Sequence, residues 1–258
     1  MSKVQSPKSQ TDQTSEQRRR LVDGGVWTLD FGLKAIDLRK SFLSPGGEKI
    51  DVLRGIFFSA SAGEIVAISG ASGAGKSTLL HLLGGLEAAD HGTVLLGQFD
   101  ITQVSASTLA RFRNNRVGFV FQFHHLLADL TALENVALPL MIARRSRDES
   151  MARATGALER LGLGERLNHP IGHLSGGEQQ QVAVARALVT IPEVVLADEP
   201  TGNLDRSISD EIGAVLVAYC RERRAVVVVA THNERLAKLC DRILLLEAGL
   251  IREASKRV

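Results

Sequence analysis

Gly70-Ala71-Ser72-Gly73-Ala74-Gly75-Lys76-Ser77 is the most informative segment of this 258-residue sequence. It matches G-x-x-x-x-G-K-S and lies between the apolar run EIVAIS (64–69) and the helical pattern TLLHLL (78–83). This strand–loop–helix context predicts that backbone N–H groups hold a polyphosphate, that Lys76 reaches its β- and γ-phosphates, and that the Ser77 hydroxyl binds Mg²⁺. The predicted nucleotide contacts here are Gly70, Ala71, Ser72, Gly73, Ala74, Gly75, Lys76, Ser77 and Thr78.

Two carboxylates end a second apolar run, VVLADEP (194–200). A buried parallel strand delivers its last residues to the carboxyl edge of the sheet, where ligands bind in such folds. Asp198 would hold Mg²⁺ through water, and Glu199 would accept a proton from the attacking water. Without residues 70–77, an ordinary solvated strand end would explain this pair equally well.

Short apolar runs alternate with helical patterns from Leu33 onward, which is typical of an α/β fold with a mostly parallel sheet. Strands are predicted at 64–69, 117–121, 194–197, 225–230 and 243–246. The stretch 122–190 reads mainly as helices, which indicates an inserted helical subdomain. We therefore expect a polar extension at 1–32, disordered at least to residue 25, and a folded domain at 33–258 with its core at 33–121 and 191–258.

The charge balance is nearly even, with 31 basic and 29 acidic residues, and the first 20 residues alone hold five basic and two acidic ones. A nearly neutral body argues against a nucleic-acid partner. The basic tail is expected to be a solvated end, with attraction to anionic lipid as the alternative. No apolar run is long enough to span a bilayer and no signal peptide is evident, so a cytosolic protein is expected. Cys220 and Cys240 are expected to be packed thiols.

Residues 174–178, Leu-Ser-Gly-Gly-Glu, open another helical pattern. Ser175 and Glu178 have the spacing of a capping box, which alone would indicate only a well-capped helix. Two adjacent glycines cost about 1 kcal/mol each in a helix, so Gly176 and Gly177 indicate that something approaches the uncovered N–H groups. Because residues 70–77 already hold the phosphates of their own chain, that ligand would be a nucleotide held by another copy.

With these segments in this order, residues 33–252 resemble the ATP-binding-cassette (ABC) ATPases. The resemblance implies a P-loop NTPase fold with a RecA-like mixed sheet core, an antiparallel β subdomain and an inserted α-helical subdomain. It implies hydrolysis of ATP with Mg²⁺ by a head-to-tail dimer, in which the signature sequence, residues 174–178, contacts the γ-phosphate held by the second copy. It also implies integral membrane permease subunits as partners, and a peripheral position on the cytoplasmic face of the inner membrane.

Further positions take their roles from this resemblance. Gln122 matches the glutamine that senses Mg²⁺ and the attacking water, His232 matches the switch histidine on the γ-phosphate, and Phe42 stands where the family places an aromatic ring against adenine. The implied catalytic set is Glu199, His232, Lys76 and Gln122. The implied Mg²⁺ ligands are Ser77, Gln122 and Asp198. The implied signature contacts are Ser175, Gly176, Gly177 and Glu178. The implied dimer-interface loop is Gly202, Asn203, Leu204 and Asp205.

Within the family, the run QFHHLLADLTALENVALPL (122–140) is similar to the ATPase subunits of lipoprotein-releasing systems, so lipoprotein release toward the outer membrane is the expected activity. We call residues 123–126 the docking loop, because they are expected to border the groove that receives a short helix of the membrane subunit. Ordinary packing of the helical subdomain is the alternative. The members of the docking loop are Phe123, His124, His125 and Leu126.

Two positions depart from the family pattern: Gln181 where Arg is usual, and Asn233 where Asp is frequent. Neither belongs to the catalytic set. His169 and His173 are not expected to bind zinc, because Pro170 separates them. Three other functions stay open: a related ATPase for macrolide or peptide efflux or for cell division, a soluble ABC protein acting on nucleic acid or ribosomes, and a regulatory nucleotide-binding module without turnover.

Overall fold

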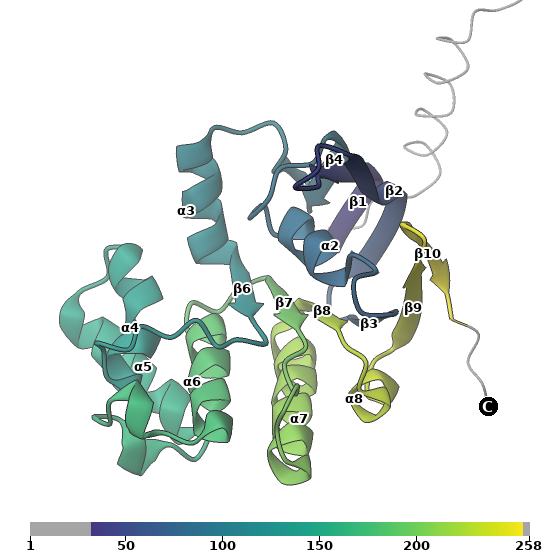
Figure 1. Ribbon diagram of the computed structural model, residues 1–258. Coiled ribbons are helices and arrows are strands. Elements are labelled where there is room, and N and C mark those ends of the chain that lie inside the picture. Colours follow the sequence, from purple (N-terminus) through teal and green to yellow (C-terminus); the bar gives the residue numbers. More distant parts are fainter. Residues whose placement is uncertain (1–31, 255–258) are drawn as a thin grey trace, which may run out of the picture. The chain divides into compact units, whose positions relative to one another are not determined.

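Two β-sheets and the helices around them make up residues 32–254, the part of the chain that this computed structural model describes (Figure 1). The polar extension expected at 1–32, with its disorder to residue 25, lies outside this part, apart from Gly32. The larger sheet has the order β10-β9-β3-β8-β7-β6. Its strands are β3 (Ile65–Ser69), β6 (Val117–Val120), β7 (Val194–Asp198), β8 (Val226–Ala230), β9 (Arg242–Glu247) and β10 (Leu250–Glu253).

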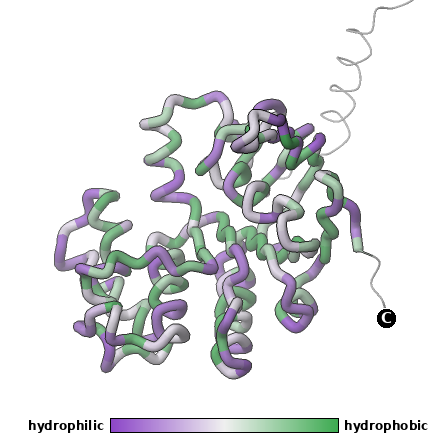
Figure 2. Tube along the Cα trace, in the orientation of Figure 1, coloured by the Kyte–Doolittle hydropathy of each residue, from purple (hydrophilic) through white to green (hydrophobic). Residues whose placement is uncertain are grey.

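All neighbouring strands of this sheet are parallel except β9 and β10. The five strands predicted from the sequence are therefore all present, with ends that agree to one residue. In β7, Val194 and Leu196 face one hydrophobic cluster while Val195 and Ala197 face another. A strand buried on both faces needs an uninterrupted apolar run, which is why these segments stand out in the sequence. Figure 2 shows the same concentration of apolar residues along these strands.

A smaller antiparallel sheet has the order β2-β1-β4-β5. Its strands are β1 (Gly32–Leu43), β2 (Lys49–Ser61), β4 (His91–Leu96) and β5 (Phe99–Asp100). Helix α2 (Lys76–Leu83) contributes four buried leucines to the cluster that also holds residues of both sheets. The phosphate loop at the start of α2 is thus anchored by a core shared between the sheets.

Helices α6 (Gly176–Leu188), α7 (Arg206–Arg223) and α8 (Glu234–Lys238) supply the cluster on the other face of the larger sheet. Helix α3 (Ala106–Arg116) lies beside β6. A third cluster joins α4 (Ala132–Ile142), α5 (Arg147–Glu159) and α6, with the short 3-10 helices η1 (Gly164–Arg166) and η2 (Ile171–His173) in the connection (Figure 1). Helix α6 therefore belongs to two clusters, through Val184 on one face and Val182 on the other.

The sheets and helices agree with the fold class that the resemblance implies. The helices expected in 122–190 are present, although residues 121–131 contain none. The division into a core at 33–121 and 191–258 and a subdomain at 122–190 stays a prediction.

Candidate active site

The phosphate loop, residues 70–75, joins the end of β3 to the start of α2. Gly73 and Gly75 have φ angles of +76° and +99°, a region that residues with a Cβ rarely adopt. Gly75 is the N-cap of α2, and no side chain bonds the first N–H groups of this helix. Such a helix end favours an anion. The Lys76 ammonium group donates to the carbonyls of Gly70 and Ala71 at 2.8 and 3.0 Å, so its positive charge lies at the same loop.

The predicted acid pair stands at the end of β7. Asp198 is the last residue of that strand, and Glu199 follows it with a φ of 45°. A left-handed backbone costs on the order of 1–3 kcal/mol for a residue with a side chain, and such residues cluster at functional sites. The Glu199 N–H donates to the carbonyl of Ala230 in β8 at 2.8 Å, and its carbonyl accepts the Gly202 N–H at 2.9 Å. These backbone bonds hold Glu199, a residue that is only 8% exposed, at the edge of the sheet.

His232 contacts both oxygens of the Glu199 carboxylate. Its Nδ1 lies 2.8 Å from Oε1, and its backbone N–H donates to Oε2 at 3.2 Å. The imidazole is otherwise 73% exposed, two residues after the end of β8. The structure thus brings the predicted base and the predicted switch histidine together from neighbouring strands.

Gln122 follows β6, the strand next to β7, and its side chain lies against the segment after Glu199. A Cβ built on Gly202 would be 3.4 Å from the Gln122 amide nitrogen. The hydroxyl of Ser77, the carboxylate of Asp198 and the amide oxygen of Gln122 are the hard oxygen donors that Mg²⁺ prefers. Ser77 is exposed in the first turn of α2, so its hydroxyl is accessible. These three residues therefore fit the ion chemically.

No cluster of three or more His, Cys, Asp or Glu side chains that could hold a metal occurs within residues 32–254. His173 belongs to the short helix η2, and His169 precedes it in the connection from η1. The two histidines thus lie on no common α-helix, as Pro170 predicted.

The signature sequence begins α6, with Ser175 as its N-cap. The Ser175 hydroxyl accepts the Glu178 N–H at 3.2 Å and the Glu178 carboxylate accepts the Ser175 N–H at 2.8 Å, so the predicted capping box is present. The bond from the Ser175 N–H, followed by that from Arg166 at 2.9 Å, lowers the pKa of Glu178 below its usual value. Ser175 and Gly176 are both exposed at this helix end.

The two signature glycines have different surroundings. A Cβ on Gly177 would lie 2.2 Å from Cδ1 of Ile208 in α7, whereas a Cβ on Gly176 would meet nothing within 4 Å. Close packing against Ile208 is therefore a second reason for a glycine at 177, and only at Gly176 does open space leave an approaching ligand as the remaining reason. The nucleotide contacts of both glycines stay predictions. Within residues 32–254, no contact given above connects the signature, residues 174–178, to the phosphate loop, residues 70–75.

The loop after Glu199 leads into α7. Asn203 has a φ of 61°, and Asp205 caps α7 by accepting the Ile208 N–H at 3.0 Å. Both residues are exposed, whereas Gly202 is half-buried and Leu204 packs against the cluster of α6 and α7. The predicted dimer-interface loop thus presents its polar residues outward.

Both departures from the family pattern have structural partners. Gln181 donates to the carboxylate of Glu211 in α7 at 3.4 Å. Asn233 caps α8 by accepting two backbone N–H groups, and its amide donates to Thr201 Oγ1 at 3.2 Å. Neither residue contacts Glu199 or His232 through these bonds.

Phe42 lies near the end of β1 and is 42% exposed. The Lys40 ammonium nitrogen is 5.1 Å from the centre of its ring, and it also donates to the Glu87 carboxylate at 2.7 Å. The ring therefore has the Lys40 ammonium group near it and keeps part of its surface accessible, and its contact with adenine stays a prediction.

The docking loop connects β6 to α4 and presents an aromatic side chain outward. Phe123 is 73% exposed, Leu126 is half-buried, and the ring of His125 meets Phe121 edge-on at 5.0 Å. Burial, followed by the nearby charge of Arg186, lowers the pKa of His124 below its usual value. The histidines of the docking loop thus contact the rest of the protein, whereas the side chain of Phe123 is exposed.

Three residues around the site were missed in the sequence. Arg186 donates to the docking loop, Lys40 contacts Phe42, and the Gln180 amide nitrogen donates to the carbonyl of Pro200 at 2.8 Å. Gln180 is only 2% exposed, so it fixes α6 to the segment that follows Glu199. A signal was available for Arg186, since an arginine within the apolar run VAVARAL (182–188) must find partners for a half-buried charge.

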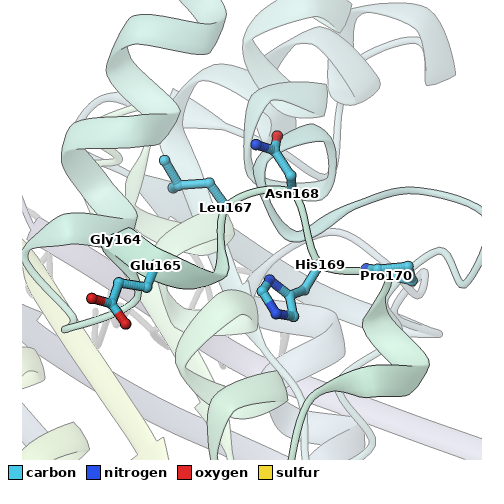
Figure 3. A pocket seen from close by; sticks show the side chains of 6 residues that line it. All are labelled: Gly164, Glu165, Leu167, Asn168, His169 and Pro170. Carbon is cyan, nitrogen blue, oxygen red and sulfur yellow. The ribbon is translucent and has the colours of Figure 1, made fainter.

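A pocket of about 410 Å³ lies in the connection between η1 and η2 (Figure 3). Backbone bonds from Ala132 to His169 and from Leu133 to Leu167 fix this connection to α4. The lining contains no residue of the predicted site and consists of Gly164, Glu165, Leu167, Asn168, His169 and Pro170.

Cys220 and Cys240 are free thiols that face the core. Burial raises the pKa of Cys220 to about 11 and that of Cys240 to about 12. Both are packed thiols, as expected, and neither is poised to react as a thiolate. Within residues 32–254, every helix is too short or too polar to cross a bilayer.

Residues 53–202 match the sequence profile of the ABC transporter family. The chain is 49% identical over 219 residues to the lipoprotein-releasing system ATP-binding protein LolD of Geobacter metallireducens, covering 85% of this chain and 97% of that protein. It is 50% identical over 208 residues to the LolD protein of Myxococcus xanthus, covering 81% and 93%. Its structure resembles the dimeric ATP-binding cassette MJ0796 bound to ADP and phosphate, with a TM-score of 0.82, 37% identity, and coverage of 88% of this chain and 99% of that one.

Proposed function

The chain belongs to the ABC transporter family, and on that premise we propose that it is the ATP-hydrolysing subunit of a complex that releases lipoproteins from the inner membrane toward the outer membrane. The cargo assignment is supported by the two relatives above, which are about half identical to this chain and are ATP-binding proteins of lipoprotein-releasing systems. The resemblance of residues 122–140 to such subunits points the same way.

The pairing of Glu199 with His232 is the observation that carries the ATPase assignment. A buried carboxylate with a histidine 2.8 Å away, at the sheet edge that also bears the phosphate loop, suits general-base activation of water beside a γ-phosphate. A regulatory module without turnover would need neither residue. ATP hydrolysis coupled to transport is accordingly the reaction of this site.

Each residue of the site has one task in this reaction. The phosphate loop and Lys76 bind the β- and γ-phosphates, and the ring of Phe42 stacks on the adenine. Glu199 orients the attacking water and accepts its proton. His232 donates to the γ-phosphate and holds Glu199 in place. Most of the rate enhancement comes from this positioning and from positive charge placed where negative charge develops.

Mg²⁺ would be held by Ser77, Asp198 and Gln122, the three oxygen donors that fit it. Bound there, it would neutralise charge on the β- and γ-phosphate oxygens. Because Gln122 lies beside Gly202, the same glutamine would report the state of the phosphates to the docking loop that follows it.

The signature would act on the nucleotide of a second copy in a head-to-tail dimer. Ser175 and Gly176 are exposed at the start of α6, and the partial positive charge of a helix N-terminus favours an anion there. The interface would also include Gly202, Asn203, Leu204 and Asp205. ATP would favour the closed dimer and hydrolysis would reopen it, which makes the dimer a two-state element that can move its membrane partners.

Integral membrane permease subunits would complete the assembly, with this chain peripheral on the cytoplasmic face of the inner membrane. The docking loop, with Phe123 as its exposed aromatic residue, would receive a short helix of such a subunit. Apolar residues that stand open on a surface are typical of such contacts.

Glu199→Gln tests the role of the base. The amide retains the shape of the side chain but cannot accept the proton of water, so ATP binding should persist while steady-state phosphate release falls by about 10²-fold or more. Size-exclusion chromatography with ATP and Mg²⁺ should then show a stable dimer, because the closed state is no longer released by hydrolysis.

Glu193→Gln is the matched control, since Glu193 precedes β7 and its partly exposed carboxylate pairs with Arg116, away from Glu199 and His232. It should hydrolyse ATP at the wild-type rate. An undiminished rate in Glu199→Gln would overturn the assignment of the base. Failure of the purified wild type to release phosphate would overturn the ATPase function itself.

A further inference from the structure

The docking loop is fastened to α6 by one guanidinium group. Arg186 Nη1 donates to the carbonyl of His125 and Nη2 donates to the carbonyl of His124, both at 2.7 Å. Arginine presents two donors in a fixed fork, so a single side chain fixes two consecutive peptide groups. Arg186 is half-buried, so its guanidinium group lies partly beneath the loop that it holds.

The peptide that Arg186 holds has an unusual conformation. His125 has a φ of 48°, in the left-handed region that residues with a Cβ rarely adopt. Such a backbone persists only where its surroundings fix it, and it is common in segments that switch between two states. On its other side, the His125 ring meets Phe121 at 5.0 Å, and Phe121 meets His81 of α2 at 6.1 Å. The loop is thus held between the signature helix and the helix of the phosphate loop.

Helix α6 is a rigid connection between the signature and Arg186. Gly176 opens the helix and Arg186 lies in its last turn, about 15 Å along the axis. The intervening residues pack into two hydrophobic clusters, so a displacement of the first turn moves the whole helix rather than bending it.

We propose that Arg186 is the positioning residue through which the nucleotide state at the signature end of α6 sets the conformation of the docking loop. This inference rests on the function proposed above, because it assumes that the signature meets the nucleotide of a second copy. Arg186 lies in the last turn of α6, at the opposite end from the signature, and it links this helix to the surface offered to the membrane subunit.

Hydrogen exchange on the full chain tests the link. All proteins carry Glu199→Gln, so that ATP is retained, and Arg186→Gln and Arg186→Lys are compared with Arg153→Gln. Arg153 is the matched control because it also donates to a carbonyl at the end of α6, that of Val189 at 3.1 Å, and its other partner is Glu149. Exchange is followed at residues 174–180 and 122–127 with and without ATP and Mg²⁺, and thermal unfolding is recorded for each protein.

In the parent protein and in Arg153→Gln, ATP should slow exchange at both segments. In Arg186→Gln, residues 174–180 should still respond, whereas residues 122–127 should exchange at least about tenfold faster and lose their response to ATP. Arg186→Lys keeps the charge without the fork and should recover part of the response. Stimulation of hydrolysis by the membrane subunits, measured without Glu199→Gln, should be lost in Arg186→Gln and kept in Arg153→Gln.

A docking loop that still responds to ATP in Arg186→Gln overturns the inference. So does an equal loss at both segments, or an equal loss in Arg153→Gln, because either result would indicate a general structural role. If Arg186→Gln does not fold, Arg186→Lys takes its place. The inference is then overturned if ATP slows exchange at residues 122–127 of Arg186→Lys as much as in the parent protein. If ATP does not change exchange at residues 174–180 of the parent protein, the proposed function is overturned, and the inference with it. This outcome differs from the others because the response is missing at the signature itself.

Discussion

Lys40 carries its charge on a nearly buried side chain, only 11% exposed, next to the ring of Phe42. Its ion pair with Glu87 and its bond to the carbonyl of Ala88 connect β1 to the segment after α2. These contacts raise the pKa of Lys40, the bond to Glu87 being the largest cause, so the ammonium group stays charged. Phe42 is thus oriented before any base stacks on it.

Lys40→Met should therefore weaken ATP binding more than it weakens chemistry. Loss of a partly shielded cation–π contact predicts a KM for ATP about threefold to tenfold higher with kcat unchanged. Lys49→Met is the control, because Lys49 lies on the facing strand and pairs with Asp51 at the surface. Steady-state kinetics measure both constants. A fall in kcat at constant KM would contradict the role of Lys40 in orienting Phe42 for ATP binding.

Gly176→Ala and Gly177→Ala should have opposite effects, although the residues are adjacent. The Cβ of the second would overlap Cδ1 of Ile208, which predicts a loss of about 1–3 kcal/mol of unfolding free energy. Ile208→Val removes that atom and should restore the stability of Gly177→Ala. Gly176→Ala has open space and should be as stable as the wild type or up to about 1 kcal/mol more so.

The variants Gly176→Ala and Gly177→Ala also distinguish a glycine needed for packing from a glycine needed for contact with a nucleotide. If the start of α6 meets a nucleotide of the second copy, Gly176→Ala should weaken the ATP-dependent dimer while leaving the monomer intact. Denaturant unfolding and size-exclusion chromatography of the Glu199→Gln form provide the two readings. A Gly176→Ala protein that dimerises as well as its parent would count against a signature acting in trans.

At the scale of elements, the first turn of α6 is stabilised by an ionised carboxylate. Because the folded-state pKa of Glu178 is lowered from its ordinary value of 4.5, its contribution to stability is complete above about that pH and is lost as pH falls through the folded-state value. Glu178→Gln keeps the capping geometry without the charge. The wild type should thus be more stable than Glu178→Gln at neutral pH, and this advantage should shrink below pH 4.5.

Urea unfolding at a series of pH values measures this advantage. Arg166→Gln is the companion variant, because it removes the ion pair at 2.9 Å and leaves the Ser175 bonds in place. It should lose a smaller share of the pH dependence, since the Ser175 N–H is the larger cause of the lowered pKa. A pH profile of Glu178→Gln parallel to that of the wild type would contradict the argument.

The strands that could be predicted from the residues are β3, β6, β7, β8 and β9, the parallel strands of the larger sheet. β3, β7 and β8 are continuous apolar runs with clear ends, and the phosphate loop and the acid pair follow directly from them. The antiparallel strands were expected only from the resemblance. β1 has register shifts after Ala35 and Leu38, and Asp37 has a φ of 50°, so its apolar alternation is broken.

Within the site, residues that act by their type were predictable and residues that act by their contacts were not. Lys76, Glu199 and His232 are reactive side chains in recognisable patterns. Gln180 and Arg186 matter because they bond backbone carbonyls of distant segments, and no local pattern in the sequence indicates which carbonyls those are.

At the scale of the whole molecule, the site divides into groups that one chain brings together and groups that it does not. Lys76, Glu199 and His232 stand at neighbouring strands of one sheet, whereas the contacts of Ser175 go to Glu178 in its own helix. Variants in the first group should therefore not complement one another in a mixed dimer. A variant in the signature should complement any of them.

Mixing Lys76→Ala with Ser175→Asp tests this division. Asp keeps the N-cap of α6 but repels phosphate, so each variant alone should be inactive. A hybrid dimer would contain one site with both Lys76 and Ser175 intact, and the mixture should hydrolyse ATP faster than either protein alone. The control mixture, Lys76→Ala with His232→Ala, leaves no intact site and should stay inactive. Equal rates in the two mixtures would mean that the signature serves its own chain.

Helix α6 completes the hydrophobic cluster that it shares with α4 and α5, and this has a consequence for synthesis on the ribosome. Residues of α4 and α5 such as Val136 and Leu158 emerge before α6, and their shared cluster is complete only when Val182 and Ala185 have followed. The nascent chain therefore exposes an apolar surface during this interval, when chaperones have most to protect. A translational pause between α5 and α6 should increase aggregation of the newly made protein more than a pause after α6, when the cluster of α4, α5 and α6 is complete.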